Sequence, residues 1–340
     1  MKRFFLILQI FVLKILINST VLSQDPIFSQ LNNSPLNLNP AFAGNNHSPV
    51  IYINSRIEWP LFNFAYNTHA LSADMLFKRI KIGAGVMVLM DDSGNGIYKR
   101  FKAEGIISYL LKVSENNFFK IGLGFAYGQN SLDWSKLIFG DMIDNYSGFT
   151  LPDGSSIPTE EEIPYNLTKK YFDISAGLLY YSKKIFAGVA IKHANTPANY
   201  YFENLNDAVN KGLPVRLTAQ IGGEIRLFPG DSYHHRFYSP AFLYAFQSGM
   251  HQFAFNNYID LGGFFGNIGF RHNFTNSDAV IIGAGLSKNI FKIGYSFDYT
   301  VSKLGINTGG SHELGITINL ENTRLSAKEY RYSDCFGQFR

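Results

Sequence analysis

The chain has 340 residues, of which only 16% are charged while 16% are aromatic. This charged fraction is well below the roughly 25% of typical globular proteins, which argues against a soluble secreted protein. The net charge of +4 comes with no basic patch for nucleic acid, and a single cysteine, Cys335, excludes an intramolecular disulfide framework. After residue 23 no stretch approaches about 18 uninterrupted apolar residues, so spanning helices are excluded. A membrane protein made of strands remains.

Residues 1–23 have the layout of a secretory signal peptide. Lys2 and Arg3 form a short basic start, and residues 4–17 form an apolar run. Val21 and Ser23 are small residues before a plausible cleavage point. A signal anchor is the alternative. However, the apolar run is shorter than the roughly 20 residues that a spanning helix needs and is broken by Gln9 and Lys14. We therefore predict export, with the net charge of the mature chain close to zero.

The segment 24–47 is predicted to be an ordered N-terminal arm. Its three prolines and many asparagines disfavour a regular helix or a ladder strand, yet it carries six large apolar side chains. Such a segment needs a surface to lie on, which is either the lumen of the chain's own barrel, as a plug, or a partner protein. Our hypothesis is that Phe28, Leu38 and Phe42 are partner-binding anchors and that Pro40 sets the bend into the first strand.

Alternation with a period of two recurs through 48–320 and predicts an all-β fold. In residues 119–128, for example, large apolar side chains alternate with small or polar ones. Most segments have about the 9–11 residues that a tilted strand needs to cross a bilayer. We predict a closed antiparallel outer-membrane β-barrel of about fourteen strands, near 50–59, 68–78, 80–90, 98–111, 118–130, 170–181, 185–193, 214–227, 237–248, 250–260, 265–272, 279–286, 291–300 and 311–320.

The polar faces of these strands would place charges of both signs in the lumen. The cations are Arg56, Lys102, Lys120, Lys192, Arg216, Arg226 and Lys292. The acids are Glu58, Asp74, Glu104, Asp173, Glu224, Asp298 and Glu313. This balance favours a paired interior network over an ion-selective pore, because a selective pore concentrates one sign.

The lengths of the connections indicate an orientation. If the N-terminus lies in the periplasm, the connections after even-numbered strands should be short and those after odd-numbered strands long, as most of them are. The longest is the predicted outer loop 131–169, which is too long for a simple connection. Its apolar part, Leu137–Asp144, is expected to fold back into the barrel mouth. A tail, 321–340, follows the last strand.

No constellation for catalysis or metal binding stands out. His234 and His235 are adjacent and without metal-ligand spacing. Ser296, Asp298 and Glu313 fall on the lumen side of their strands, whereas His312 falls on the lipid side. The glycines Gly122, Gly124 and Gly128 are read as small lumen-facing residues beside bulky neighbours. We therefore expect no enzyme activity and no cofactor.

Several sequence blocks, in order, resemble the PorP/SprF family of type IX secretion membrane proteins. At the N-terminus they are Gln24-Asp25-Pro26-x-Phe28-Ser29-Gln30 and Asn39-Pro40-Ala41-Phe42-Ala43-Gly44. Intermediate matches are 137–144, 172–177, 188–197 and 239–242, and the strongest signature is Ile293–Leu304 followed by Gly309–Leu314. The chain departs from relatives in continuing through 321–340, which leaves open where its assembly signal lies.

This resemblance implies an outer-membrane barrel that works with the type IX secretion and gliding machinery. It implies two partners: periplasmic components of the machine, and a secreted adhesin-like cargo protein whose export or surface attachment the barrel supports. The alternative hypothesis is a porin or a transporter of apolar solutes. A barrel enzyme is the third and weakest hypothesis.

Overall fold

The computed structural model describes residues 25–46, 48–62, 66–143, 155, 157–199, 201, 212–228, 236–274, 276–302, 305–320 and 335–339. The expected signal peptide lies outside these residues, as does the tail from 321 to 334. Within the described part, no helix is long and apolar enough to cross a membrane.

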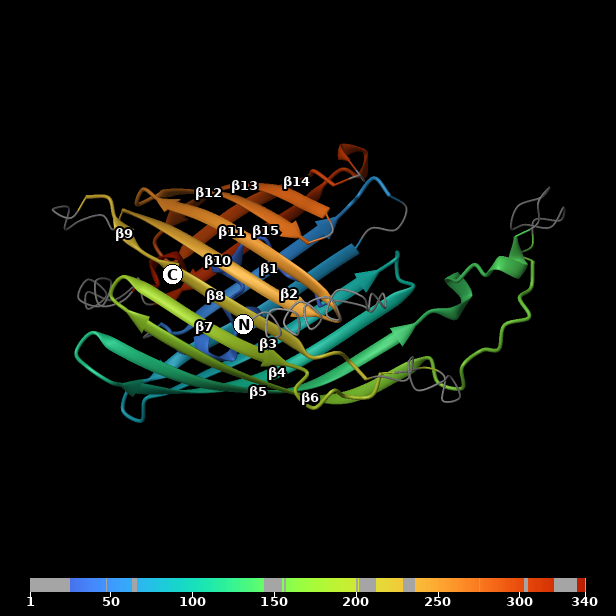
Figure 1. Cartoon of the computed structure of the whole chain (residues 1–340), viewed down its shortest axis with the longest axis horizontal. Coiled ribbons are helices and arrows are strands. Elements are labelled where there is room, and N and C mark those ends of the chain that lie inside the picture. Colours follow the sequence, from blue (N-terminus) through green and yellow to red (C-terminus); the bar gives the residue numbers. More distant parts are fainter. Residues whose placement is uncertain are drawn as a thin grey trace, which may run out of the picture.

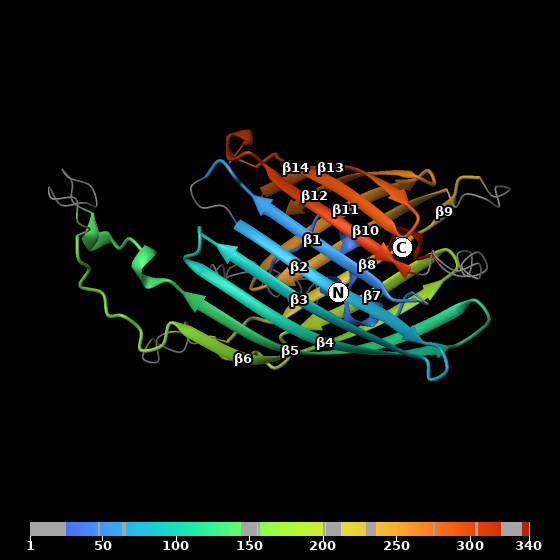
Figure 2. The same ribbon diagram turned by 180° about the vertical axis from the view of Figure 1, so that it is seen from behind.

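The described strands form one closed antiparallel barrel (Figures 1 and 2). β8 and β9 both pair with β10 and are two parts of one wall strand, so the wall has fourteen strands, as predicted. The strands are β1 (Val50–Glu58), β2 (Tyr66–Phe77), β3 (Ile82–Ser93), β4 (Tyr98–Lys112), β5 (Asn117–Leu132), β6 (Thr168–Ser182), β7 (Ile185–Lys192), β8 (Arg216–Gly223), β9 (Ile225–Arg226), β10 (Phe237–Gln247), β11 (Met250–Asp260), β12 (Phe264–Asn273), β13 (Asn276–Lys288), β14 (Phe291–Thr300) and β15 (Ser311–Asn319).

The barrel closes where the last strand meets the first. β15 pairs with β1 over nine residue pairs, from Val50 opposite Asn319 to Glu58 opposite Ser311. β10 pairs with β11 at the other end of the strand order, so the ladder is continuous around the wall. Closure leaves no unpaired strand edge toward lipid, which is the condition for a sheet to span a bilayer.

Alternation decides which side chains face outward. On β5 the side chains of Phe119, Ile121 and Phe125 are exposed on the outer wall, whereas those of Lys120 and Ala126, each next to one of them in sequence, are buried inside. A tilted strand can meet lipid with one face and the lumen with the other only in this pattern. The apolar outer wall and the polar lumen are therefore both encoded by the period of two.

The short helical segments are few and lie mostly outside the wall strands. The N-terminal arm contains η1 (Leu31–Asn33), α2 (Pro35–Leu38) and η2 (Pro40–Phe42). η3 (Trp134–Lys136) and η4 (Gly140–Met142) belong to the long loop, η5 (Ile306–Thr308) precedes β15, and η7 (Gly337–Phe339) belongs to the tail. We call the end of the barrel with the connections 78–81, 113–116 and 183–184 the short-turn end, and the opposite one the long-loop end.

The described part of the long loop between β5 and β6 does not fill the mouth of the barrel. Figure 1 shows its described part extending away from the barrel. None of the side chains from Trp134 to Ile143 is buried, and Ile138 is 53% exposed. The prediction that Leu137–Asp144 folds back into the mouth is therefore wrong. The reason is that the lumen is already occupied by another segment, so the apolar residues of the loop pack on each other, as Trp134 does on Phe139.

Candidate functional site

The N-terminal arm lies inside the lumen and runs along it. Asp25 contacts Arg100 near the start of β4 and His193 just after β7, which places the beginning of the arm toward the long-loop end. Ala43 accepts hydrogen bonds from Ser108 and Lys120 near the short-turn end. Every described residue from 28 to 46 is buried. The surface on which the arm lies is thus the inner wall of the barrel's own lumen.

Apolar side chains of the arm fill three separate places on the inner wall. Phe28 packs with Ala70 and Leu89 of β2 and β3. Leu31 and Leu38 pack with Leu243 and Ala254 of β10 and β11. Each such side chain gains about 1.5–3 kcal/mol on full burial, which offsets much of the cost of ordering the segment.

A third cluster surrounds the end of the arm. Leu36 and Phe42 contact Met87, Ile106, Leu179 and Phe186 of the wall, and the ring centroids of Phe42 and Phe186 are 6.1 Å apart. Phe28, Leu38, Pro40 and Phe42 are all buried in this way. In this structure the four side chains contact the chain's own barrel; that they bind a partner protein stays a prediction.

The Asn39–Gly44 turn is set directly against the wall, where glycines make room for it. Asn39 Nδ2 donates to the backbone carbonyls of Leu178 and Val189 at 3.1 and 3.2 Å. A Cβ added at Gly177 would lie 1.9 Å from Asn39 Oδ1, and one added at Gly122 would lie 2.3 Å from the nitrogen of Ala41. Only a residue without a side chain permits this approach.

The bend into the first strand lies at Gly44 rather than at Pro40. Pro40 begins η2, where the side chain of Asn39 accepts a hydrogen bond from the nitrogen of Ala41 at 2.8 Å. Gly44 has a φ of +68°, a conformation that favours glycine, and its nitrogen donates to Asp74 Oδ2 at 2.6 Å. Pro40 therefore fixes the turn inside the lumen, and Gly44 turns the chain toward β1.

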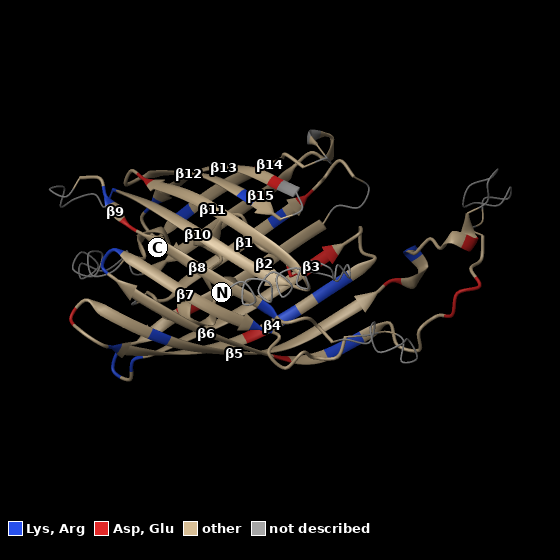
Figure 3. Cartoon of the chain, in the orientation of Figure 1, with Lys and Arg blue, Asp and Glu red and all other residues tan. Residues whose placement is uncertain are grey.

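One ion-pair network holds the start of the arm. Figure 3 colours the Lys, Arg, Asp and Glu positions along the ribbon. Asp25 Oδ1 lies 2.7 Å from Arg100 Nη1, and Asp25 Oδ2 lies 2.7 Å from His193 Nε2. The other side of the imidazole faces Asp173, 3.1 Å from His193 Nδ1, and Asp173 also pairs with Lys102 at 2.9 Å. This chain of charges links β4, β6 and the end of β7 to the arm.

A second network holds Ser29 and Gln30. Arg56 Nη2 lies 2.8 Å from Asp298 Oδ2, and Arg56 Nη1 lies 3.2 Å from Glu313 Oε2. The backbone nitrogens of Ser29 and Gln30 donate to the two oxygens of Glu313 at 2.7 and 3.0 Å. The arm thus supplies hydrogen-bond donors that the wall carboxylates need.

Twelve of the fourteen charges predicted for the lumen are buried in the described structure. Glu58 is the thirteenth: its side chain is 30% exposed, and it pairs with Arg56. Arg226 is not in the lumen, because the strand is interrupted at Glu224 and both residues of β9 are exposed. The prediction failed there because alternation of faces holds only while the strand is regular.

The sequence reasoning missed several members of the networks. Arg100 and Arg271 have the inward parity of their strands and could have been found from alternation. His193 directly follows β7, and Asp25 lies in an arm without any periodicity, so the alternation of strand faces marks neither, although both lie in blocks that carry the family resemblance. Arg271 pairs with Asp298 at 3.0 Å and also with Asp278.

The described end of the tail also lies inside the lumen, at the short-turn end. Cys335, Phe336 and Phe339 are at most 4% exposed and belong to the cluster of Phe42 and Phe186. The centroid of the Phe336 ring lies 4.8 Å from that of Tyr181. The arm and residues 335–339 therefore both help to fill the barrel.

The residues considered for catalysis are separated by the wall. Ser296, Asp298 and Glu313 are buried inside. His312 is on the outer face, where its Nδ1 lies 2.6 Å from the hydroxyl of Tyr295. Among the described residues there is no group of three or more His, Cys, Asp or Glu that could hold a metal ion.

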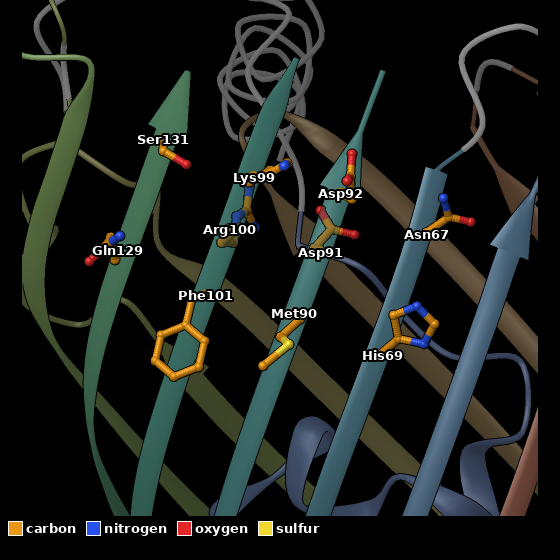
Figure 4. Close-up of a pocket in the computed structure, with 10 residues that line it drawn as sticks. All are labelled: Asn67, His69, Met90, Asp91, Asp92, Lys99, Arg100, Phe101, Gln129 and Ser131. Carbon is orange, nitrogen blue, oxygen red and sulfur yellow. The ribbon is translucent and has the colours of Figure 1, made fainter. Parts of the chain in front are cut away.

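A shallow hollow of about 490 Å³ lies at the long-loop end of β2 to β5 (Figure 4). His69, Met90 and Phe101 line its lower part, and Asn67 and Lys99 lie higher. Met90 and Phe101 make the lower part more apolar than the upper part, as expected where a barrel wall passes from the bilayer core into its interface.

The two parts of the long loop are tied together outside the barrel. Asp141 Oδ2 accepts hydrogen bonds from the backbone nitrogen of Glu160 at 2.6 Å and from Thr159 Oγ1 at 2.9 Å. The bond from Glu160 is the main cause that lowers the pKa of Asp141 below its usual value. The described parts of the loop thus contact each other outside the barrel.

Comparison with known proteins decides the family. The family model described as type IX secretion system membrane protein PorP/SprF matches residues 20–318. The chain belongs to the PorP/SprF family. Membership and the closed barrel make it an outer-membrane component of the type IX secretion system. A comparison with curated proteins finds no match.

Among solved structures, this PorP/SprF chain is similar to other barrels. The toluene transporter TbuX of Ralstonia pickettii is 12% identical with a TM-score of 0.48, over 84% of this chain and 92% of that one. The toluene transporter TodX of Pseudomonas putida is 9% identical with a TM-score of 0.43, over 87% and 93%. The KdgM porin is 8% identical with a TM-score of 0.37, over 80% and 99%.

Proposed function

We propose that the protein supports the export or surface attachment of an adhesin-like cargo protein through the type IX secretion and gliding machinery, and that it does so without enzymatic activity. It works through its surfaces, with periplasmic components of the machine and the cargo as partners. Family membership supports a role in the type IX secretion system. The occupied lumen is the observation that favours a surface-based role over passage of solutes.

The contacts of the arm support this proposal. A pore needs a continuous polar path, but here the lumen holds an arm of which residues 28–46 are buried. Ionic networks tie the arm to β1, β4, β14 and β15, and its apolar side chains are enclosed by the wall. Several charges of opposite sign are paired with each other, such as Arg56 with Asp298 and Lys102 with Asp173, whereas selective channels have rings of one sign.

The test is made in cells. A strain lacking the chain should lose one large protein from its surface, measured by mass spectrometry of peptides shaved from intact cells, while uptake of small solutes is unchanged. Re-expression of the chain should restore that protein. If no surface protein is lost and solute uptake falls instead, the proposal is wrong and a transporter takes its place.

A further inference from the structure

The short-turn end of the lumen contains a pocket whose side chains form hydrogen bonds with the main chain of residues 337–339. Glu224 Oε2 accepts a hydrogen bond from the nitrogen of Gly337 at 3.0 Å. Lys292 Nζ donates to the carbonyl of Gln338 at 2.9 Å, and the hydroxyl of Tyr52 donates to the carbonyl of Phe339 at 2.9 Å. Three side chains from three different parts of the wall thus form hydrogen bonds with main-chain atoms of three consecutive residues, 337–339.

Two aromatic rings complete the fit. The ring centroid of Phe336 lies 4.8 Å from that of Tyr181 and 5.8 Å from that of Phe186. Phe339 lies 5.0 Å from Phe42. Because Gly337–Phe339 form a single 3₁₀ turn, the rings at positions i and i+3 fall on the same side. Aromatic pairs at such distances prefer tilted or edge contacts, and these are observed.

The position between the rings is also specific. A Cβ added at Gly337 would lie 2.6 Å from Glu224 Oε2 and 3.0 Å from the ring of Phe237. The pocket therefore selects a small residue after the first phenylalanine. Main-chain hydrogen bonds that supply affinity, together with side-chain pockets that supply specificity, characterise peptide-recognition sites.

We propose that this pocket is a peptide-binding site for a Phe-Gly-x-Phe segment, that residues 335–339 occupy it within the same chain, and that a protein on the side of the membrane faced by the short turns can present such a segment in their place. The site contains Phe42 of the arm, so the occupant of the pocket contacts the end of the plug. The inference goes beyond the proposed role in cargo export and does not depend on it.

The first experiment measures binding of a labelled peptide in detergent micelles. The peptide is Ser-Asp-Ser-Phe-Gly-Gln-Phe-Arg, the sequence of residues 333–340 with serine for the cysteine. Full-length protein with Phe336→Ala and Phe339→Ala, which vacates the aromatic pocket, should bind it saturably. Wild-type protein should bind at least about tenfold more weakly, since its own segment competes. A peptide with alanine for both phenylalanines should not bind.

The second experiment uses the only cysteine of the chain as a reporter. Cys335 is buried beside Phe336, so alkylation of the folded wild-type protein should be slow. Addition of the unlabelled peptide should accelerate alkylation to a plateau, because it displaces residues 335–339. The alanine peptide should have no effect.

Several outcomes would overturn the proposal. In the binding experiment they are absence of peptide binding by a folded double variant, equal binding of both peptides, and equal binding by wild type and variant. In the alkylation experiment it is a rate that does not respond to the peptide. Folding is verified by the mobility shift of the barrel on heating in a gel. If the double variant does not fold, Glu224→Gln, which alters one hydrogen-bond acceptor, replaces it and should accelerate Cys335 alkylation; an unchanged rate would count against the site. None of these results depends on secretion, so failure here and failure of the proposed function are distinguishable.

Discussion

Arg56 and Asp298 form an ion pair inside the barrel, with 2.8 Å between Nη2 and Oδ2, and both side chains are 1% exposed. They lie on β1 and β14, on either side of the closing strand β15, which contributes Glu313 to the same guanidinium. The hydroxyl of Ser29 donates to Asp298 at 2.6 Å and accepts from Arg56 at 2.5 Å. The closure of the barrel and the position of the arm therefore depend on one cluster.

Replacing Arg56 by methionine should destabilise the folded barrel by about 3–5 kcal/mol, because Glu313 and Asp298 would lose a buried partner. The measurement is the midpoint of urea unfolding, followed by the heat-dependent gel shift. Glu58→Gln is the control. Glu58 contacts the same guanidinium, but its side chain is 30% exposed, so the variant should lower the free energy of unfolding by less than about 1 kcal/mol. Equal losses for the two variants would contradict a special role for the buried pairs.

The triple variant Phe28→Ala, Leu38→Ala, Phe42→Ala should release the arm from the lumen. Each truncation removes buried contacts worth about 2–5 kcal/mol, while the hydrogen bonds between wall strands remain. We expect wild-type protein to conduct little in planar bilayers and the triple variant to conduct steadily. Ile27→Ala, at a partly buried position, is the control. Conductance that is identical in wild type and triple variant would show that the arm does not block the lumen.

A side chain at Gly122 should displace the turn of the arm. Its Cβ would lie 2.3 Å from the nitrogen of Ala41, so Gly122→Val forces the backbone of the arm away from β5 and costs at least about 1–3 kcal/mol. Gly105→Val on the neighbouring strand is the matched control, since a Cβ there meets nothing within 4 Å. Hydrogen exchange of the amides in 28–46 should accelerate only in the first variant. Equal exchange in both would argue against close docking.

Orientation in the membrane is tested by labelling in a Cys335→Ser background. We expect Glu161→Cys, in the long loop, to react with an impermeant maleimide on intact cells. Glu115→Cys, in the turn between β4 and β5, should react only after the cells are opened. Both positions are exposed, so accessibility to the reagent depends on the side of the membrane. Labelling of both on intact cells would disprove the predicted orientation.

Alternation along the chain determined the wall. On β5, Phe119 and Lys120 point to opposite sides simply because successive residues of a strand do so, and this local rule needs no knowledge of partners. It located all fourteen wall strands and twelve of the buried charges. It failed at Arg226, where the interruption at Glu224 breaks the regular backbone on which the rule depends.

Only the tertiary structure decided what fills the barrel. The arm has no periodicity, and both a lumen and a partner would satisfy its apolar side chains. What decides between them is a surface assembled from distant strands: Gly122 and Gly177 leave space where Asn39 and Ala41 approach, and Arg100 and His193 meet at Asp25. The same holds for Phe336, whose pocket exists only when β6, β7 and the arm lie side by side. The face to which a strand residue points follows from the alternation of successive residues. The segment that fills the lumen is selected by the shape and charge of a surface that exists only once the barrel is closed.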